Sequence, residues 1–140
     1  MNGKIKVLLI TGIHGFVGSN LVVALKERHG LYGLDIVTPE KDGVIKTFSW
    51  DDLDKEMPEF DAVIHLAAQI EVASSERDPL RDASLNIGGT LAVLEGARKA
   101  HVSRFVFASS AAVYGHPSEA LLPLAEEAPL CPLSPYGLSK

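Results

Sequence analysis

The sequence has 140 residues, a mean hydropathy of +0.15 and a formal net charge of −5, from 18 acidic and 13 basic side chains. This length supports one domain that buries about two-thirds of its unfolded surface, and the acidic balance excludes a basic stripe for nucleic acid. No apolar run is as long as the about 20 residues needed to cross a membrane, and we expect no signal peptide. We also expect no disulfide framework, because Cys131 is the one cysteine. Composition therefore favours a cytoplasmic enzyme core without nucleic-acid or membrane partners.

The chain starts with the pattern of a strand, a glycine turn and a helix. The apolar run from Ile5 to Ile10 predicts a parallel strand buried on both faces, three glycines follow at once, and apolar residues then recur at helical spacing until Gly30. In such a turn the glycines permit a tight bend, close approach of a ligand and close helix packing, while N–H groups at the helix start face a pyrophosphate. The spacing is G-x-x-G-x-x-G rather than G-x-G-x-x-G, so an ordinary glycine-rich turn is the alternative. The predicted cofactor contacts here are Gly12, Gly15, Phe16, Val17 and Gly18.

Residues 31–35 are expected to form the second strand, which ends in an acid. Asp35 lies 23 positions after Gly12, near the spacing expected for a carboxylate that binds the adenosine ribose hydroxyls. The same charge would repel a 2′-phosphate, and the next basic residue is Lys41, so the sequence favours NAD over NADP. A solvated loop aspartate is the alternative interpretation.

The remaining elements alternate as in a doubly wound α/β fold. Right-handed crossovers predict a parallel sheet of strand order 3-2-1-4-5, with ligand groups at the carboxyl ends of the strands. We expect an ordered loop over residues 115–135, which contain five of the eight prolines, and the apolar residues Leu85, Leu91, Leu94 and Ala97 on the inner side of the long helix. The expected strands are residues 44–48, 61–66 and 104–108, and the expected helices are residues 50–57 and 82–100.

The last five residues contain a tyrosine and a lysine that can move a proton together. A free tyrosine ionises near pH 10, so a tyrosine that acts as a base near neutral pH requires a nearby cation. Lys140 follows Tyr136 by four residues, which places both side chains on one helical face. Ser110, after the fifth strand, could hold a substrate hydroxyl in line with the phenolate. As a bare pattern, Y-x-x-x-K is common, and an exposed helical tyrosine is the alternative.

Seven segments together resemble the extended short-chain dehydrogenase/reductase family, in its NAD-dependent sugar-nucleotide epimerase/dehydratase branch. They are TGIHGFVGSNL (11–21), Asp35, VIHLAAQ (63–69), DP (78–79), NIGGTLAVLEGARKA (86–100), RFVFASSAAVYG (104–115) and SPYGLSK (134–140). The resemblance implies a Rossmann domain followed by a smaller substrate domain, in a chain about twice as long. Residues 1–140 would then be a partial NAD-binding domain, truncated before the sixth strand and lacking the C-terminal substrate domain.

The resemblance also implies roles for individual residues. Tyr136 and Lys140 match the catalytic tyrosine and lysine, and Ser110 matches the catalytic Ser/Thr. The acid that holds adenine in many relatives has no clear match, because this chain has Phe48-Ser49-Trp50-Asp51-Asp52 there. Besides the glycine turn and Asp35, the implied cofactor contacts are Leu66, Ala67, Ala68 and Asn86; no metal ligand is implied.

Two segments of the sequence limit the choice of reaction within this branch of the family. Dehydratases of this branch carry an acid pair where this chain has Ala111-Ala112, which disfavours elimination. Ala67-Ala68-Gln69 with Asp78-Pro79 is most similar to UDP-glucose 4-epimerases, in which the tyrosine takes a proton from a sugar hydroxyl while hydride passes to NAD⁺. The predicted substrate is therefore a UDP-sugar. A nucleotide-sugar reductase or decarboxylase, or a non-catalytic dinucleotide-binding fragment, natural or engineered, are the alternatives.

Two further hypotheses concern the chain as a whole. A chain cut within its last helix would have little or no turnover, and its exposed outer strand would favour self-association or a homodimer. Residues 1–64 contain 2 alanines and 6 lysines, whereas residues 65–140 contain 13 alanines and 2 lysines. This shift suggests a chimeric junction near His65, which would be tested by separate searches with the two parts.

Overall fold

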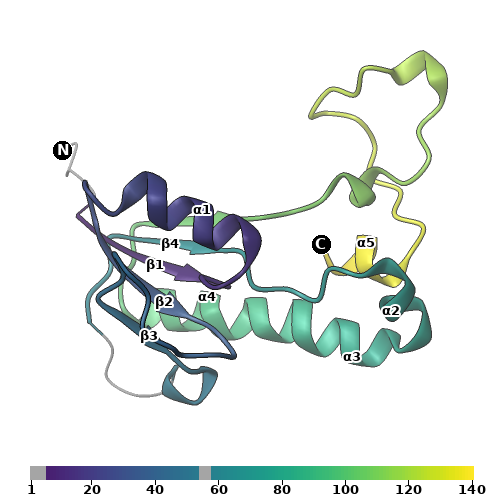
Figure 1. Ribbon diagram of the computed structural model, residues 1–140. Helices are drawn as coiled ribbons and strands as arrows, with labels where there is room; N and C mark the ends of the chain where they lie inside the picture. Colours follow the sequence, from purple (N-terminus) through teal and green to yellow (C-terminus); the bar gives the residue numbers. More distant parts are fainter. Residues whose placement is uncertain (1–5, 54–57) are drawn as a thin grey trace. The chain divides into compact units, whose positions relative to one another are not determined.

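The computed structural model describes residues 6–53 and 58–140 (Figure 1). The chain divides into two compact units, which are described separately. The first, here called the sheet unit, comprises the described residues of Met1–Ala67 and Thr90–Ala108. The second, here called the helix unit, comprises Ala68–Gly89 and Ser109–Lys140.

The sheet unit contains a five-stranded parallel sheet, whose strand order β3-β2-β1-β4-β5 confirms the predicted topology. β3, β4 and β5 are one or two residues shorter than expected, because the expected ranges included flanking residues that make no ladder; β2 is shifted by one residue, and β1 extends to Thr11. Three helical elements accompany the sheet: α1 (Phe16–Leu25), the short 3₁₀ helix η1 (Trp50–Asp52) and α4 (Gly89–Lys99). The strands are β1 (Val7–Thr11), β2 (Gly30–Leu34), β3 (Lys46–Phe48), β4 (Ala62–His65) and β5 (Arg104–Phe107).

Alternating side chains of β1 build two hydrophobic cores, one on each face of the sheet. Leu9 packs with Val63 and with Val93 of α4 in one core. Leu8 and Ile10 point to the opposite face, where they pack in the second core against α1. Because successive residues of a strand face opposite sides, a buried strand with helices on both faces must be apolar throughout. This explains the continuous apolar run at the start of the sequence.

The predicted helix over residues 82–100 is wrong in detail, because three segments replace it. They are α3 (Pro79–Ala83), a π-helical segment η2 (Ser84–Gly88) and α4. The extra residue in a π turn changes the phase of the helix, so the stripe extrapolated from a regular period does not persist. Leu85, Leu91 and Leu94 are exposed, whereas the buried positions of these segments are Asp82, Asn86, Val93 and Ala97.

The predicted helix over residues 50–57 is observed only as η1. η1 comprises Trp50–Asp52, and Ser49 caps this turn through a reciprocal pair of hydrogen bonds with Asp52. Residues 54–57, like Ile5 of the predicted first strand, lie outside the described residues.

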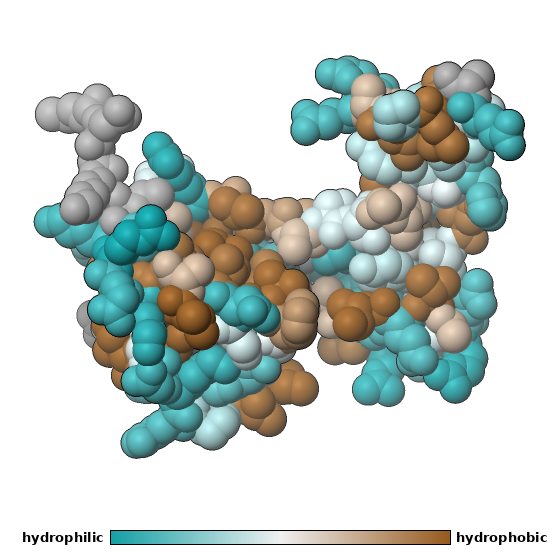
Figure 2. Space-filling view, turned by 45° about the horizontal axis from the view of Figure 1, so that its top comes forward, coloured by the Kyte–Doolittle hydropathy of each residue, from teal (hydrophilic) through white to brown (hydrophobic). Residues whose placement is uncertain are grey.

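The helix unit is made of short segments and an extended loop. Two of its α-helices have side-chain caps: the N–H of Arg81 donates to Asp78 Oδ1 (3.0 Å) in α3, and the N–H of Gly137 donates to Ser134 Oγ (3.0 Å) in α5 (Pro135–Ser139). The expected loop over residues 115–135 is observed, with one 3₁₀ turn, η4 (Glu119–Leu121). Exposed apolar residues occur on the surface of both units (Figure 2). The other elements are α2 (Val72–Arg77), η3 (Ala111–Tyr114) and α5 (Pro135–Ser139).

Asp61 should make the stability of the sheet unit sensitive to acid. Its Oδ2 accepts the backbone N–H groups of Lys6 (2.7 Å) and Val7 (2.8 Å), and these bonds hold the pKa of the Asp61 carboxyl below its ordinary value. A lowered folded-state pKa gives stabilisation that is complete above the unfolded-state pKa and is lost as the pH falls through the folded-state value. Asp61→Asn should therefore lower Tm at pH 7, and the difference from the parent should shrink as the pH falls below about 4.

The measurement is Tm by circular dichroism between pH 7 and pH 2. Asp51→Asn, at an exposed position in η1, is the control for loss of one negative charge. A Tm difference for Asp61→Asn that is independent of pH would contradict the assignment.

Candidate functional site

The glycine turn follows β1 directly and passes against the segment that follows β4. Gly12 has φ +68°, a conformation that favours glycine, and its N–H donates to Leu34 O (2.8 Å). A Cβ on Gly12 would lie 3.0 Å from the backbone nitrogen of Ala67. The turn closes with the N–H of Gly15 donating to Gly12 O (3.0 Å). The first glycine thus joins the ends of β1 and β4, as predicted for a tight turn.

Gly18 permits α1 to start close to the turn. A Cβ at this position would lie 2.4 Å from Gly12 O and 2.7 Å from the Cα of Ile13, both backbone atoms that cannot move aside. Gly15 is the N-cap of α1 and supplies no side-chain cap, so the first-turn N–H groups are left for another acceptor. Phe16 and Val17 of that first turn are exposed. A cradle that side chains would fill, at a helix N-terminus, fits a pyrophosphate.

Asp35 is both a candidate ribose ligand and a structural link, and the second role was missed by sequence analysis. The residue is 8% exposed; its Oδ2 accepts the N–H of His14 (2.9 Å) and its Oδ1 accepts the N–H of Ile36 (2.7 Å). The acid after β2 is therefore bonded to the glycine turn itself. Lys41 also reaches this region, since its Nζ donates to Ser19 Oγ (2.8 Å) in α1. Its position six residues after Asp35 in the sequence gave no sign of that contact.

A buried hydrogen-bond chain fixes Leu66 and Ala67. Thr11 Oγ1 accepts the N–H groups of Leu66 (3.1 Å) and Ala67 (3.0 Å) and lies 2.7 Å from His65 Nδ1. With both hydroxyl lone pairs in use, Thr11 must donate its hydrogen to Nδ1. His65 therefore carries its proton on Nε2, which donates to Thr90 Oγ1 (3.1 Å). This neutral, buried histidine positions the predicted cofactor segment rather than binding a ligand.

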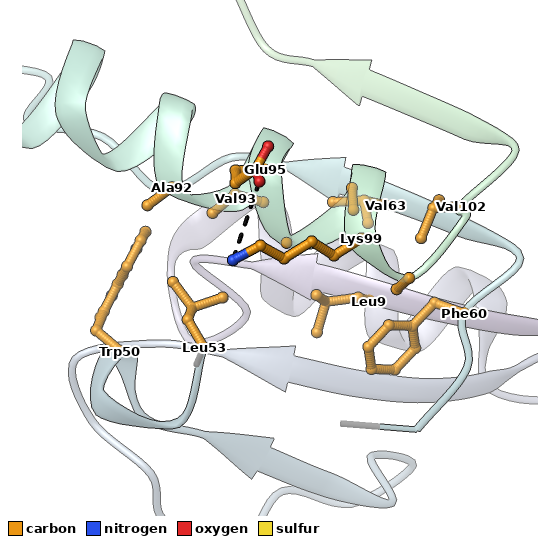
Figure 3. Close-up of a pocket in the computed structure, with 13 residues that line it drawn as sticks. Leu9, Trp50, Leu53, Phe60, Val63, Ala92, Val93, Glu95, Lys99 and Val102 are labelled. Carbon is orange, nitrogen blue, oxygen red and sulfur yellow. Dashed lines mark ion pairs between the residues drawn. The ribbon is translucent and has the colours of Figure 1, made fainter. Parts of the chain in front are cut away.

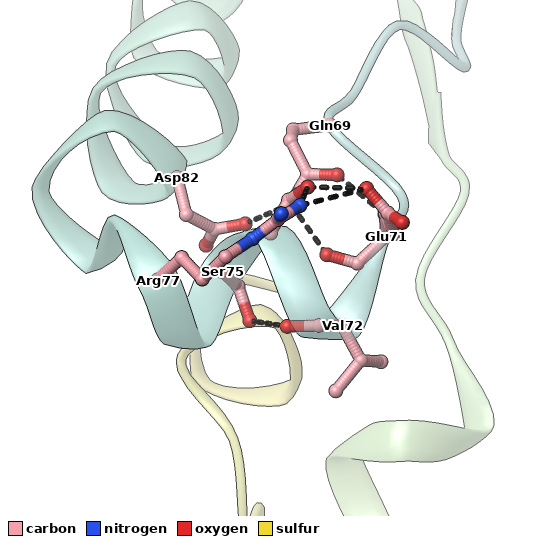
Figure 4. A network of polar contacts seen from close by, with 7 residues as sticks. Gln69, Glu71, Val72, Ser75, Arg77 and Asp82 are labelled. Carbon is pink, nitrogen blue, oxygen red and sulfur yellow. Dashed lines mark hydrogen bonds and ion pairs between the residues drawn. The ribbon is translucent and has the colours of Figure 1, made fainter.

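In the helix unit, Asn86 is the centre of a polar network (Figure 4 shows Gln69 and Asp82, two of its partners). The Asn86 side chain is buried in the π-helical segment; its Oδ1 accepts the N–H of Gln69 (2.7 Å) and its Nδ2 donates to Gln69 O (3.0 Å). Asn86 Nδ2 also donates to Ser139 Oγ (2.9 Å) in α5. Asn86 therefore joins the segment after Ala68 to the helix that carries Tyr136.

Tyr136, Lys140 and Ser110 lie in the same unit. Tyr136 and Lys140 are half-buried on and directly after α5, and a Cβ at Gly137 would lie 2.7 Å from Ala112 O, so α5 packs closely against η3. Ser110 is the N-cap of η3, where its Oγ accepts the N–H of Ala112 (3.2 Å). Burial lowers the pKa of the Lys140 ammonium, and the charge of Asp82 acts in the opposite direction.

The predicted residues thus form two groups, each within one unit. The sheet unit contains the glycine turn with its neighbours Phe16 and Val17, Asp35, and the Leu66-Ala67 segment. The helix unit contains Ala68, Asn86 and the three predicted catalytic residues. Sequence analysis missed Thr11, Ser75, Asp82 and Ser139, whose buried or half-buried hydroxyl and carboxylate groups hold these segments.

A separate apolar cavity of about 510 Å³ lies in the sheet unit, between η1 and α4 (Figure 3). Leu9, Trp50, Phe60 and Val63 line it, and at its edge Lys99 forms a 3.9 Å ion pair with Glu95. None of the predicted site residues contributes to its lining. Within residues 6–53 and 58–140, no cluster of three His, Cys, Asp or Glu side chains could hold a metal ion. In the same residues no helix has the length and apolar character needed to cross a bilayer.

A parallel sheet of order β3-β2-β1-β4-β5, a glycine cradle at a helix N-terminus and an acid after β2 define a dinucleotide-binding α/β fold. Residues 8–140 match the NAD dependent epimerase/dehydratase family, and the chain belongs to that family. NAD is accordingly the family's cofactor, and the glycine cradle and Asp35 fit it.

The chain is similar in sequence to two curated relatives and in structure to one solved enzyme, among others. The chain is 40% identical over 134 residues to the GDP-6-deoxy-D-mannose reductase of Pseudomonas aeruginosa, covering 95% of this chain and 43% of that protein. It is 38% identical over 149 residues to the UDP-glucose 4-epimerase of Mycolicibacterium smegmatis, covering 94% and 47%. The UDP-Glc/GlcNAc 4-epimerase structure from Campylobacter jejuni is similar with a TM-score of 0.83 and 33% identity, covering 96% and 46%. The chain thus spans less than half the length of the relatives it matches.

Gly18→Ala should disrupt the turn. The added Cβ meets backbone, so α1 or the turn must shift, and we expect the free energy of unfolding to fall by about 1–3 kcal/mol, as for an overpacked site. The measurement is urea unfolding followed by circular dichroism. Gly96→Ala in α4 is the control, because its Cβ would have only an ordinary 3.9 Å contact with Leu53 and should stabilise the helix by about 0.5–1 kcal/mol. Parent-like stability of Gly18→Ala would refute the close approach.

Asp35→Asn should reduce discrimination between the two nicotinamide cofactors. The substitution keeps the size of the side chain but removes the charge that opposes a 2′-phosphate, and like charges in contact cost several kcal/mol. We expect the ratio of the Kd for NADP⁺ to that for NAD⁺ to fall by about tenfold or more, measured by isothermal titration calorimetry. Asp51→Asn should leave the ratio unchanged. An unchanged ratio in Asp35→Asn would show that Asp35 serves only as a structural link.

Proposed function

We propose that this chain is the NAD-binding part of a sugar-nucleotide 4-epimerase that uses Ser110, Tyr136 and Lys140 as its catalytic residues. The observation that carries the proposal is α5, a short capped helix that presents Tyr136 and Lys140 at a spacing of four residues and packs on η3, which Ser110 caps. This arrangement supports a tyrosine base with a cation beside it and a serine hydroxyl nearby.

The residues that would hold NAD are those of the sheet-unit turn, with Ala68 and Asn86 from the helix unit. Gly12, Gly15 and Gly18 leave the space for the pyrophosphate, and Asp35 would accept hydrogen bonds from the ribose hydroxyls. When bound, NAD supplies the acceptor and donor of hydride. Leu66 and Ala67, held by Thr11, would lie along the cofactor.

The chemistry assigned to the chain's own side chains is proton transfer. Tyr136 Oη would take the proton from a sugar hydroxyl and later return it, and Ser110 would hold that hydroxyl in place. The Lys140 ammonium would stabilise the phenolate electrostatically, which requires that Lys140 stays protonated although it is half-buried.

A UDP-sugar is the proposed substrate, because several relatives are named UDP-glucose 4-epimerases and because Ala111-Ala112 replaces the acid pair expected for dehydratases. A reductase acting on a GDP-sugar is the second candidate. It is favoured by the similarity to the P. aeruginosa reductase and by the similarity to a structure of RMD from the same species complexed with NADPH. The contact of Lys41 with Ser19, which brings a cation to the region of Asp35, favours it as well.

Three statements about the whole protein also remain proposals. The edge position of β5 and the 54% exposure of its Val106 support self-association or a homodimer. The match to less than half of each relative supports low turnover by these 140 residues alone. A cytoplasmic location and a chimeric junction near His65 have only the composition in their favour.

The test is formation of UDP-galactose from UDP-glucose with added NAD⁺, followed by NMR. We expect the parent to form product only slowly, since it matches less than half of each relative, and Tyr136→Phe to be slower still by at least about 100-fold, the usual contribution of a general acid–base group. Tyr114→Phe, in η3, is the matched control and should retain the parent rate. Equal rates for the parent and Tyr136→Phe would refute the assigned role.

Parallel reactions distinguish the alternatives. Oxidation of NADPH with a GDP-4-keto-sugar, without UDP-glucose epimerisation, would identify the reductase. Stabilisation of about 2.7 kcal/mol by NAD⁺ at 100 times its Kd, with no turnover of either substrate, would identify a non-catalytic dinucleotide-binding fragment.

A further inference from the structure

The helix that carries Tyr136 is too short to hold its own conformation. α5 has five residues, and isolated helices shorter than about 12 residues are unstable in water. Its first turn is anchored by the fully buried Ser75 of α2, whose Oγ accepts the N–H of Tyr136 (3.0 Å) and donates to Val72 O (2.7 Å). Figure 4 shows Ser75 and Val72 with this second bond. The start of α5 is therefore fixed to α2 by a serine whose own direction is fixed.

The end of α5 is anchored by a buried carboxylate. Asp82 of α3 is 2% exposed, and its Oδ2 accepts the hydroxyl of Ser139 at 2.6 Å. Its Oδ1 accepts Gln69 Nε2 (2.9 Å) and Asn86 Nδ2 (3.3 Å). A short O–H···O⁻ bond is about twice as strong as a neutral one. Ser139 Oγ also lies 3.1 Å from Tyr136 O, so the bond holds the last turn, directly before Lys140.

An amide has one acceptor oxygen, whereas Asp82 accepts hydrogen bonds on both of its oxygens, so its partners call for a carboxylate at position 82. Burial of a carboxylate costs several kcal/mol unless an opposite charge or several donors compensate. The elements packed against α5 are α2, α3 and η3. Among their titratable groups Glu76, Arg77 and Arg81 are exposed and Tyr114 is half-buried, which leaves Asp82 as the buried charge.

The cation that Asp82 can serve is Lys140, which follows Ser139. Burial lowers the pKa of the Lys140 ammonium, and the charge of Asp82 raises it. A positive charge that is half-buried needs such compensation to persist, because desolvation favours its neutral form.

We propose that Asp82 is a positioning residue for Tyr136 and Lys140: its buried carboxylate ties the end of α5 through Ser139 and supplies the negative charge that keeps Lys140 an ammonium. This inference rests on the proposed function, in which the ammonium stabilises the phenolate. Asp82 would thus have two tasks. It would hold the end of a helix, as a purely structural aspartate does, and it would also set the charge of a neighbouring side chain.

Asp82→Asn removes the charge and keeps the size of the side chain, although it replaces one of the two acceptor oxygens by an amide donor. The readout is the pH titration of the Lys140 side chain by NMR on ¹³C-lysine-labelled protein, with the signal assigned by its loss in Lys140→Arg. We expect the Lys140 pKa to fall relative to the parent, because the negative charge that raises it is removed. Asp78→Asn, which removes the same charge from the exposed cap of α3 and keeps a good capping residue, should leave it unchanged. Equal titration in the parent and both variants would overturn the proposal.

Ser139→Ala is the milder variant, and it keeps the question decidable if Asp82→Asn does not fold. It removes the 2.6 Å bond and keeps the carboxylate, so amide hydrogen exchange in α5 should accelerate about tenfold or more, and Ser139→Thr should restore protection. Unchanged exchange in Ser139→Ala would overturn the tether.

These measurements use neither cofactor nor substrate, so they separate the two levels of inference. Absence of UDP-sugar turnover, with NAD⁺ still bound, would identify a non-catalytic fragment and leave the Lys140 titration valid as a structural result. An active enzyme in which Asp82→Asn leaves the Lys140 pKa and kcat unchanged would refute only the role of Asp82.

Discussion

The geometry of the candidate cofactor site in the sheet unit depends on one contact, the close approach of α1 to the end of β1 at Gly18. The space for any side chain there is already occupied by Gly12 O and the backbone of Ile13. Because two backbones meet directly, the first turn of α1 is held beside the carboxyl end of β1, and its N–H groups face outward where a phosphate can reach them. The same turn brings the His14 N–H to Asp35, so the acid after β2 takes its direction from the glycine cradle.

In both units a buried polar side chain fixes a segment without regular structure. In the sheet unit Thr11 orders Leu66 and Ala67 with one hydroxyl, and His65 determines the direction in which that hydroxyl donates. In the helix unit Asn86 orders Gln69 through both of its backbone groups. A buried polar side chain is costly unless it is bonded, so each network strongly favours a single arrangement. Hydrophobic packing is non-directional, so packing alone would not fix the position of these segments relative to the strands and helices around them.

The parts of the structure that could be predicted from sequence are those that local patterns determine. The alternation of strands and helices, joined by right-handed crossovers, predicted the strand order. The apolar run in β1 and the three glycines after it predicted a buried strand and a tight turn, because burial on two faces and contact between backbones restrict residue type position by position. The π-helical segment could not be predicted, since it accompanies bonds between Asn86 and Gln69, which are 17 residues apart. Because the π turn was not foreseen, Leu85, Leu91 and Leu94 were wrongly assigned to the inner side of a regular helix. Asp82 left one signal that was overlooked, a carboxylate four residues before an asparagine in a segment expected to be buried.

The cofactor preference of the site depends on two opposite charges near the ribose position. Lys41 could attract a 2′-phosphate, whereas Asp35 would repel one, and at contact distance each effect reaches about 4 kcal/mol in a medium of intermediate dielectric. The two groups differ in how firmly they are held. Both oxygens of Asp35 are bonded to backbone N–H groups and the side chain is buried, so its charge cannot move away. Lys41 is held by one bond from a flexible side chain to Ser19, and it can turn into solvent at little cost. A fixed repulsion outweighs a mobile attraction, and the geometry therefore favours NAD, while a single added cation near Ser19 would suffice to shift the balance towards NADP.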